Sequence, residues 1–469
     1  GGEGHRPVSA LPPPIPASAP LEVGETWRRL HPLSPIVRFG RVLIGVLVIA
    51  VPSIAEQPGL HRDDGLPISL IIYLGLLLLG GVGGFISWLV TRWRIAEGNL
   101  QIETGFIRRQ SLRIPLARIQ AVDVISPLSG RFLGLAEVRV VSAGRGAEHG
   151  RLAYLTAAQA PVVRARLLAL AHGLEVGTPE PAAMPLLHVQ NGLLLPALLM
   201  RSQVLGPILI AVAAVLAIAA APIVGAGALG SAVTVLVVSG LGVARAFNED
   251  FDFTISEAGD GVRLDRGLLQ RRHETIPYGR IQAVRVVEPF FWRAFGWARL
   301  EVDVARQSVS READRDAQQV ARTLIPVASR DQALWLLARV MPDAHPNPPP
   351  DAGPPSRARL KAPLSFHFLA AWFGQRYVYA RTGRVQMSTI IVPLVKVQSV
   401  RLKSGPLQRT FHVATVDVDT AGRRWQASAR CRDEHEAVEM VRHISERARL
   451  SRRVPPPRPA NPIPVPAAG

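Results

Sequence analysis

Two clusters of arginine follow glycine-containing turns of the chain. One stretch reads FIRRQSLR and the other reads LLQRRHE, whereas the corresponding third stretch, RVQMSTII, has no such cluster. Guanidinium groups near a bilayer attract anionic headgroups by roughly 1 kcal/mol for each residue. Arginine is common throughout the chain, so ordinary solvated surface is the alternative interpretation. The candidates for binding a lipid or a partner are Arg108, Arg109, Arg113, Arg271 and Arg272.

A nine-residue motif occurs three times, as IPLARIQAV, IPYGRIQAV and VPLVKVQSV. Its apolar positions alternate and predict the inward face of a strand. A guanidinium or ammonium group beside it can fix backbone carbonyl groups or bind an anion. We expect the structural role, with an anion pocket as the alternative. The polar positions of the motif are Arg118, Gln120, Arg280, Gln282, Lys396 and Gln398.

No catalytic motif accompanies these residues. The sequence lacks a Walker-type phosphate loop, HExxH and GxSxG, and its 12 histidines are scattered. The single cysteine, Cys431, cannot form an intramolecular disulfide or a thiolate metal cluster. The net charge of +18 is spread along the chain, which argues against a nucleic-acid partner. We therefore expect no enzyme activity, no metal and no cofactor.

The motif copies belong to longer repeats. Copies one and two align without a gap at an offset of 162 residues, which places Arg131 on Arg293. Copy three aligns with copy two at an offset of 116, which places Arg409 on Arg293. Each copy predicts several strands followed by one helix, beginning near residues 159, 326 and 433. The hairpin glycines that align are Gly105, Gly267 and Gly383.

Two regions predict membrane hairpins. Residues 202–244 are 43 residues without a charged side chain, roughly twice the helix length that crosses a bilayer. Residues 66–90 form an uncharged run of 25, preceded by a weaker apolar segment near residues 36–55. An interfacial or re-entrant helix is the alternative for that weaker segment. Arginines flank both predicted hairpins, so the positive-inside rule places the polar segments in the cytoplasm.

The repeated pattern resembles the bacterial pleckstrin-homology domain. Its most specific stretch is IPLARIQAVDVISPLSGRFLGLAEVRV, and the arrangement resembles the YdbT-type multi-domain membrane proteins. The resemblance implies tandem domains that alternate with membrane hairpins, with little indication of chemistry. The third copy departs from it, because no full hairpin precedes that copy. We expect this copy to be tethered by a proline-rich linker or docked on the others.

The predicted fold class is an α+β membrane protein with two transmembrane helical hairpins and three pleckstrin-homology-like β-barrel domains, each closed by a C-terminal helix. Its segments are a disordered Pro-rich tail (1–35), hairpin 1 (36–91), domain 1 (92–176), hairpin 2 (202–247), domain 2 (248–341), a Pro-rich linker (342–359), domain 3 (364–450) and a second disordered Pro-rich tail (451–469).

The predicted function is a non-enzymatic scaffold or adaptor in the bacterial cell membrane. It is multi-pass, with its termini and domains in the cytoplasm, and it contacts anionic lipids or other envelope proteins. Glycine- and alanine-rich spans favour self-association. The alternative is an accessory subunit of a transport or export assembly, although the spans lack the central ionisable residues that transport ordinarily requires.

Overall fold

The computed structural model describes residues 27–36, 39–40, 42–43, 46, 68–105, 110–142, 150–171, 184–220, 226–258, 261–305, 322–422 and 425–453. Its strands are β1 (Arg28–Arg29), β2 (Arg92–Ala96), β3 (Asn99–Thr104), β4 (Gln110–Pro115), β5 (Ile119–Ser126), β6 (Leu135–Ser142), β7 (Gly150–Thr156), β8 (Met184–His188), β9 (Thr254–Ala258), β10 (Gly261–Arg266), β11 (Arg271–Pro277), β12 (Ile281–Pro289), β13 (Trp297–Val304), β14 (Arg322–Ser329), β15 (Ala370–Phe373), β16 (Tyr377–Thr382), β17 (Gln386–Pro393), β18 (Val397–Lys403), β19 (Val413–Thr420) and β20 (Ala427–Asp433).

Its helices are α2 (Ile68–Val90), α3 (Leu128–Phe132), α4 (Gln159–Ala171), α5 (Asn191–Leu199), α6 (Ser202–Ala220), α7 (Ala226–Asp250), α8 (Phe290–Ala294), α10 (Arg330–Val340), α11 (Ala358–Lys361), α12 (Pro406–Thr410) and α13 (Glu434–Ser451). Short 3₁₀ turns are η1 (Leu116–Arg118), η2 (Tyr278–Arg280), η3 (Pro350–Ala352), η4 (Phe366–Phe368) and η5 (Leu394–Lys396). We call β1–β7 with α4 domain 1, β8–β14 with α10 domain 2, and β15–β20 with α13 domain 3.

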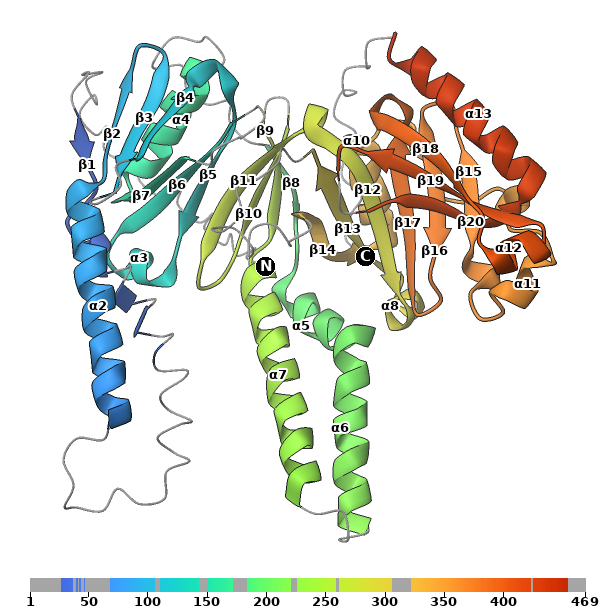
Figure 1. Ribbon diagram of the computed structural model, residues 1–469, viewed down its shortest axis with the longest axis horizontal. Coiled ribbons are helices and arrows are strands. Elements are labelled where there is room, and N and C mark those ends of the chain that lie inside the picture. Colours follow the sequence, from blue (N-terminus) through green and yellow to red (C-terminus); the bar gives the residue numbers. More distant parts are fainter. Residues whose placement is uncertain are drawn as a thin grey trace, which may run out of the picture.

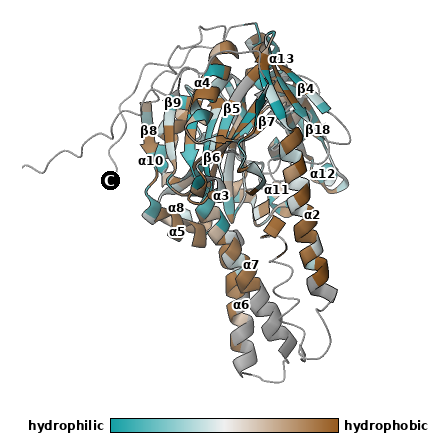
Figure 2. Ribbon diagram, turned by 90° about the vertical axis from the view of Figure 1, so that its left-hand side faces the viewer, coloured by the Kyte–Doolittle hydropathy of each residue, from teal (hydrophilic) through white to brown (hydrophobic). Residues whose placement is uncertain are grey.

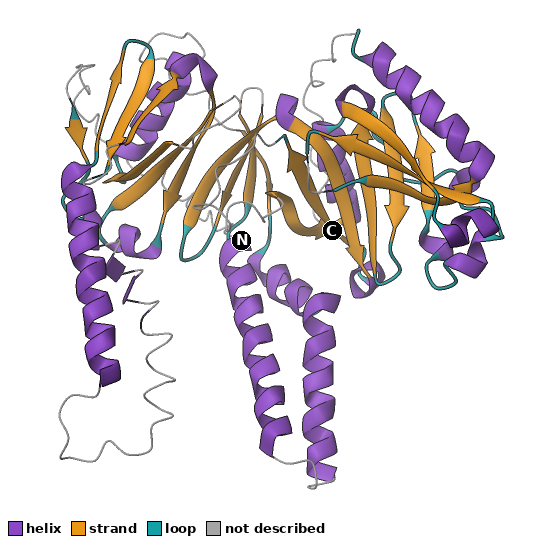
Figure 3. Ribbon diagram, in the orientation of Figure 1, coloured by secondary structure: helices purple, strands orange, loops and turns teal. Residues whose placement is uncertain are grey.

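The strands form four antiparallel sheets (Figures 1 and 3). The N-terminal sheet has the order β1-β2-β3-β4, and the C-terminal sheet has the order β18-β19-β20. Between them, the first shared sheet has the order β7-β6-β5-β11-β10-β9-β8 and the second shared sheet β14-β13-β12-β17-β16-β15. The second half of each domain is therefore continuous with the first half of the next.

The two junctions between domains have the same register. β5 pairs with β11 through Ser126 opposite Arg271, and β12 pairs with β17 through Glu288 opposite Met387. These pairs coincide when the repeats are superposed at offsets of 162 and 116 residues. Each junction thus repeats one arrangement of backbone hydrogen bonds.

Two of the hydrophobic cores also cross the second junction. Tyr379 and Ile391 of domain 3 belong to the core of domain 2, while Ala283 of domain 2 belongs to the core of domain 3. β12, at the centre of the second shared sheet, is consequently buried on both faces, and burial of this kind is the main favourable contribution to folding. The helices α4, α10 and α13 follow the strand sets where the sequence predicts helices.

The aligned glycines occupy hairpin turns that exclude a side chain. Gly267 and Gly383 have φ of 111° and 99°, and a Cβ atom on either would lie 2.0 or 2.1 Å from a backbone oxygen across the turn. Gly105 has φ of 98°. Only glycine adopts this conformation at low cost, so the repeat retains it at each β-hairpin.

The proline-rich segment 342–359 is docked and does not act as a free tether. The Tyr377 hydroxyl donates to the Pro342 carbonyl oxygen at 2.8 Å, and the Tyr379 hydroxyl accepts from the His345 backbone N–H at 2.9 Å. Burial and the neighbouring Tyr379 raise the pKa of Tyr377 to about 12. Further along the segment, the guanidinium of Arg432 donates to the carbonyl oxygen of Ala352 at 2.6 Å.

The prediction of two transmembrane hairpins is wrong. Among the described residues, one helical stretch, Ile71–Val90, is long and apolar enough by length and composition to cross a membrane. A second stretch counts only if Asn191–Leu199 and Val204–Ile210, bent by 51°, act as one span. The prediction rested on the absence of charge alone, and an uncharged run does not establish a pair of helices that each cross a bilayer. Most of residues 36–55 lies outside the described residues. The prediction of a multi-pass membrane protein depended on the two hairpins and is no longer supported.

The prediction of three separate β-barrels is wrong as well. Each domain contributes two sets of strands, but β5 and β12 pair outward with the next domain. Alternating hydrophobicity reveals which face of a strand is buried. It does not reveal to which neighbouring strand the backbone hydrogen bonds are made. Part of the predicted N-terminal tail is also a strand, because β1 pairs with β2. Residues 454–469 lie outside the described part of the chain.

The docked linker leads to a prediction on proteolysis. Replacing Tyr377 and Tyr379 together by Phe removes two hydrogen bonds, each contributing about 1 kcal/mol. We expect limited proteolysis of the full chain within residues 342–359 to accelerate about thirtyfold, since cleavage follows the open population. Tyr278→Phe, which lies outside the linker contacts, is the control. Equal cleavage rates in the unsubstituted chain, the double variant and the control would show that the linker is not held by these hydroxyls.

Candidate functional site

The five predicted basic residues lie in different environments. Arg108 and Arg109 fall outside the described residues, and Arg113 is exposed on β4. Arg271 is exposed at the start of β11, and its guanidinium lies 3.3 Å from the carboxylate of Asp252. Arg272 is partly buried, and burial lowers its pKa. Arg271 and Arg272 also belong to the strand that joins domains 1 and 2.

The motif residues of domain 2 contact backbone carbonyl groups. The Arg280 guanidinium donates to the carbonyl oxygen of Ala305 at 3.3 Å. The Gln282 side chain is buried and donates to the carbonyl oxygen of Arg280 at 3.2 Å. These contacts fix the 3₁₀ turn and the start of β12. Their geometry fits the structural role that the sequence predicts for the pair.

The other two copies differ. Arg118 is exposed, and the side chain of Gln120 lies outside the described residues. Lys396 donates from Nζ to the Gly279 carbonyl oxygen at 2.6 Å, across the second junction, and burial lowers its pKa. Gln398 is exposed on β18. The three basic positions therefore do not form three equivalent anion pockets.

A repeated contact that the motif analysis missed joins the domains. The Arg131 guanidinium donates to the Leu268 carbonyl oxygen at 2.6 Å, and Arg293 donates to the Arg384 carbonyl oxygen at 2.7 Å. In both cases an arginine of a short helix holds the hairpin turn of the following domain. Arg131 and Arg293 are aligned in the repeat, so the alignment could have identified this role.

Exposed apolar side chains surround these turns. α3 and α8 lie on the side of the molecule from which α2, α6 and α7 project (Figure 1). The turn at 267–270 meets the end of α7, because the Leu268 N–H donates to the Asn248 carbonyl oxygen at 2.9 Å. We call the exposed apolar residues of α3, α8 and the adjoining turns the apolar rim: Leu128, Phe132, Leu268, Leu269, Phe290, Phe291, Phe295 and Val385.

The three projecting helices expose apolar residues as well. Figure 2 shows hydrophobic residues along α2 and the described parts of α6 and α7, with more polar residues over the sheets. Leu79 is 71% exposed, Ile210 71% and Leu241 66%. Apolar surface of this extent ordinarily marks contact with a partner or a membrane.

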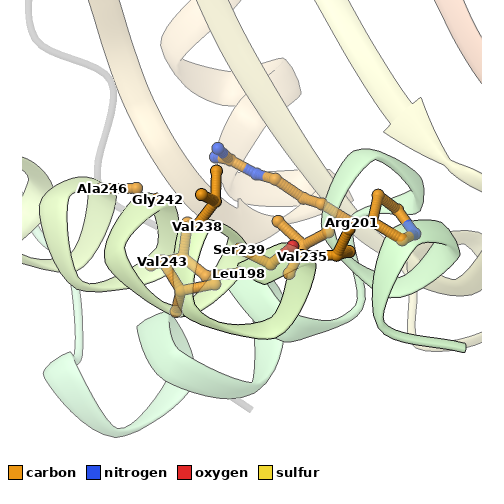
Figure 4. Close-up of a pocket in the computed structure, with 10 residues that line it drawn as sticks. Leu198, Arg201, Val235, Val238, Ser239, Gly242, Val243 and Ala246 are labelled. Carbon is orange, nitrogen blue, oxygen red and sulfur yellow. The ribbon is translucent and has the colours of Figure 1, made fainter. Parts of the chain in front are cut away.

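An apolar pocket opens between α5, α6 and α7 (Figure 4). Its volume is about 570 Å³, and its apolar lining includes Leu198, Val204 and Val243. Arg201 is the one charged residue among those that line it. Its side chain extends along the pocket towards α7 (Figure 4). The pocket therefore combines an apolar lining with one cationic side chain, that of Arg201.

Arg201 lacks a hydrogen-bond partner for Nη2 among the described residues, although that nitrogen is buried. Burial is the main cause that lowers the pKa of Arg201 to about 10, and repulsion from Arg299 is the second cause. The nearby carboxylate of Asp250 is already shared, at 3.6 Å from Arg266 and 3.5 Å from Arg299. Asp250 and Glu301 still attract the Arg201 guanidinium, which also lies over the Trp292 ring at 5.8 Å. Its Nη2 remains a buried donor without an acceptor among the described residues, and such a donor favours an anionic ligand.

The described residues contain no group of three or more His, Cys, Asp or Glu side chains that could hold a metal ion. The rim and the pocket described above consist mainly of apolar side chains with the Arg201 guanidinium as donor. Such groups can bind and orient a ligand.

The comparisons identify the repeats. A family model described as the bacterial PH domain matches residues 42–171, 194–341 and 357–448. The chain belongs to the bacterial PH domain family. The first two matches include α2 and α6–α7, whereas β1 and β8 lie before the matched residues. No curated protein and no solved structure matches the chain. The finer resemblance to YdbT-type proteins stays a prediction.

The unequal motif contacts lead to a stability prediction. Arg280→Ala removes a partly buried donor to a backbone carbonyl group and should lower the free energy of unfolding by about 1–2 kcal/mol. Arg118→Ala, at the aligned but exposed position, should change it by less than about 0.5 kcal/mol. Denaturant unfolding of the full chain in detergent measures both. A larger loss in the Arg118 variant would contradict the structural role assigned to Arg280.

Proposed function

We propose that this chain is a non-enzymatic, membrane-associated scaffold. Its three bacterial PH domains form one platform that lies against a bilayer and contacts anionic lipid and other envelope proteins. The observation that carries the proposal is the common side of α2, α6, α7 and the apolar rim, where apolar residues are exposed together. A repeated bacterial PH domain supports a role as an interaction module.

The composition of this side fits the boundary of a bilayer. Aromatic residues of the rim, such as Phe132 and Phe290, suit the level of the lipid headgroups, where aromatic side chains concentrate in membrane proteins. Arg271 begins a strand at the same turns and can meet anionic headgroups there. α2 provides an apolar helix of sufficient length for an anchor.

The pocket at Arg201 gives this side a more selective feature. An acyl chain can fill the apolar groove while an anionic headgroup accepts a hydrogen bond from the unpartnered guanidinium nitrogen. Pockets of about 300–1,000 Å³ are typical for small ligands, so the volume is adequate. We therefore propose an anionic lipid, rather than a neutral one, as the preferred occupant.

Photo-crosslinking tests which side faces lipid. A photoreactive residue at Phe132 or Phe295 in the full chain, reconstituted in vesicles of mixed neutral and anionic phospholipid, should give lipid adducts. The same residue at Val438, which is 52% exposed on α13, should give few, because α13 lies away from the projecting helices. Adducts of equal yield at all three positions, or at Val438 alone, would refute the proposed orientation.

Lipid retention tests the pocket. Arg201→Gln should reduce the anionic lipid that copurifies with the full chain at least about fivefold, because a charge-assisted hydrogen bond contributes about 1.5–3 kcal/mol. Arg245→Gln is the matched control, since Arg245 is exposed on α7 and paired with Glu249 at 3.0 Å. Native mass spectrometry in detergent measures bound lipid. Unchanged retention in Arg201→Gln would remove the pocket from the proposal and leave the rim untouched.

A further inference from the structure

The two internal junctions leave a corresponding strand free at each end of the molecule. β5 pairs with β6 and β11, and β12 pairs with β13 and β17. β18 occupies the same place in domain 3, yet β19 is its one strand neighbour among the described residues. Every residue of β12 except Arg285 is buried, whereas five of the seven residues of β18 are exposed. β18 therefore presents an open sheet edge.

The complementary edge lies in domain 1. β11 and β17 are the strands that reach the preceding domain, and β4 is their counterpart by repeat alignment. In the described part of the chain, β3 is the one strand that pairs with β4. Gln110, Ser111 and Arg113 of β4 are exposed. Unpaired edges of this kind are templates for pairing with another chain.

We propose that a second copy of this chain docks head to tail, with β4 of one copy paired antiparallel to β18 of the next. The joined strands then have the order β20-β19-β18-β4-β3-β2-β1. This order reproduces the first shared sheet, in which three strands of one domain continue into four strands of the next. The inference rests on sheet topology and does not require the proposed function.

The internal junctions also specify the register. Val286 opposite Thr389 corresponds, by the repeat offsets, to Leu402 opposite Ser111. His273 opposite Val124 gives the same correspondence from the first junction. A shift by one residue would turn every side chain to the other face, so this register is a specific expectation.

Side-chain charges permit this pairing. Arg401 and Lys403 of β18 lie 2.7 and 2.6 Å from the carboxylates of Asp419 and Asp417 on β19. Arg113 of β4 would lie opposite Val400, on the other face of the sheet from Arg401. Arg409, the counterpart of Arg131 and Arg293, is exposed and donates no side-chain hydrogen bond to any described residue. It is available for a contact with the incoming domain.

The geometry of the chain keeps added copies in one orientation. α2 lies between β1 and β2 of domain 1 and α6–α7 lie between β8 and β9 of domain 2, and these helices project from the same side (Figure 1). If the next copy docks through a junction like the internal ones, its helices project from the same side as those of the first copy. Because the two docking edges differ, the contact is heterologous, and it generates a series of oligomers rather than a closed two-fold dimer.

Cysteine crosslinking of the full chain in detergent or nanodiscs tests the contact. Leu402→Cys and Ser111→Cys are made in separate proteins, and native Cys431 stays in place because it is buried. We expect a disulfide-linked dimer when the two proteins are mixed, with little from either alone. Leu402→Cys mixed with Leu112→Cys is the control, because Leu112 points to the opposite face in the proposed register. Efficient linking of Ser111→Cys to itself, or equal linking in the control, would overturn the proposal.

Sedimentation of the unlinked chain provides an independent measurement. The weight-average mass should rise with protein concentration through dimers and larger species. Leu402→Lys and Ser111→Lys combined in one chain should weaken association about tenfold, since like charges directly opposite are unfavourable. Mixing Leu402→Glu with Ser111→Lys should restore it, and unchanged circular dichroism shows that these exposed substitutions leave the fold intact. A monomer at all concentrations would refute the inference.

Discussion

Backbone hydrogen bonding at the edges of sheets determines the organisation of this protein. A two-sheet domain with an open edge leaves N–H and C=O groups unpaired, and such edges are ordinarily covered or blunted. Here each internal edge is covered by a hairpin of the following domain, through β5 with β11 and β12 with β17. The domains are consequently parts of continuous sheets, and their relative orientation follows from strand register rather than from linker length.

Other features depend on those junctions. The arginines of α3 and α8 reach the hairpin turns of the next domain because pairing brings those turns close. The linker between domains 2 and 3 has a path along β16, where tyrosine hydroxyls bond its backbone. The helices α5–α7 are inserted in domain 2 between β8 and β9, where Trp292 donates from Nε1 to the Ala197 carbonyl oxygen at 2.9 Å. Strand pairing thereby sets where the apolar rim and the Arg201 pocket lie.

The sequence predicts the repeated parts well and their connections poorly. Strand hairpins with Gly267 and Gly383 and the closing helices follow from local patterns, because local backbone conformation determines them. The nine-residue motif was predicted as strand throughout, whereas a 3₁₀ turn interrupts each copy. The shared sheets were not predictable, since an outward-pairing edge has no side-chain signature. The hairpin prediction failed because it rested on the absence of charge alone, whereas Ile71–Val90 is the one described helical stretch that is long and apolar enough by itself to cross a membrane. The role of Arg201 was not predictable, because the burial of its Nη2 depends on how α5, α6 and α7 pack.

The shared sheets also bear on how the protein loses structure. In a linear array of coupled units, stability is approximately a sum of the intrinsic term for each unit and the terms at the boundaries between neighbours. Domain 2 has a boundary on both sides, and its core includes Tyr379 and Ile391 from domain 3. Domains 1 and 3 have one boundary each in a single chain. Opening therefore begins at the ends and reaches the centre last, so domain 2 acts as the cooperative nucleus that holds the array together.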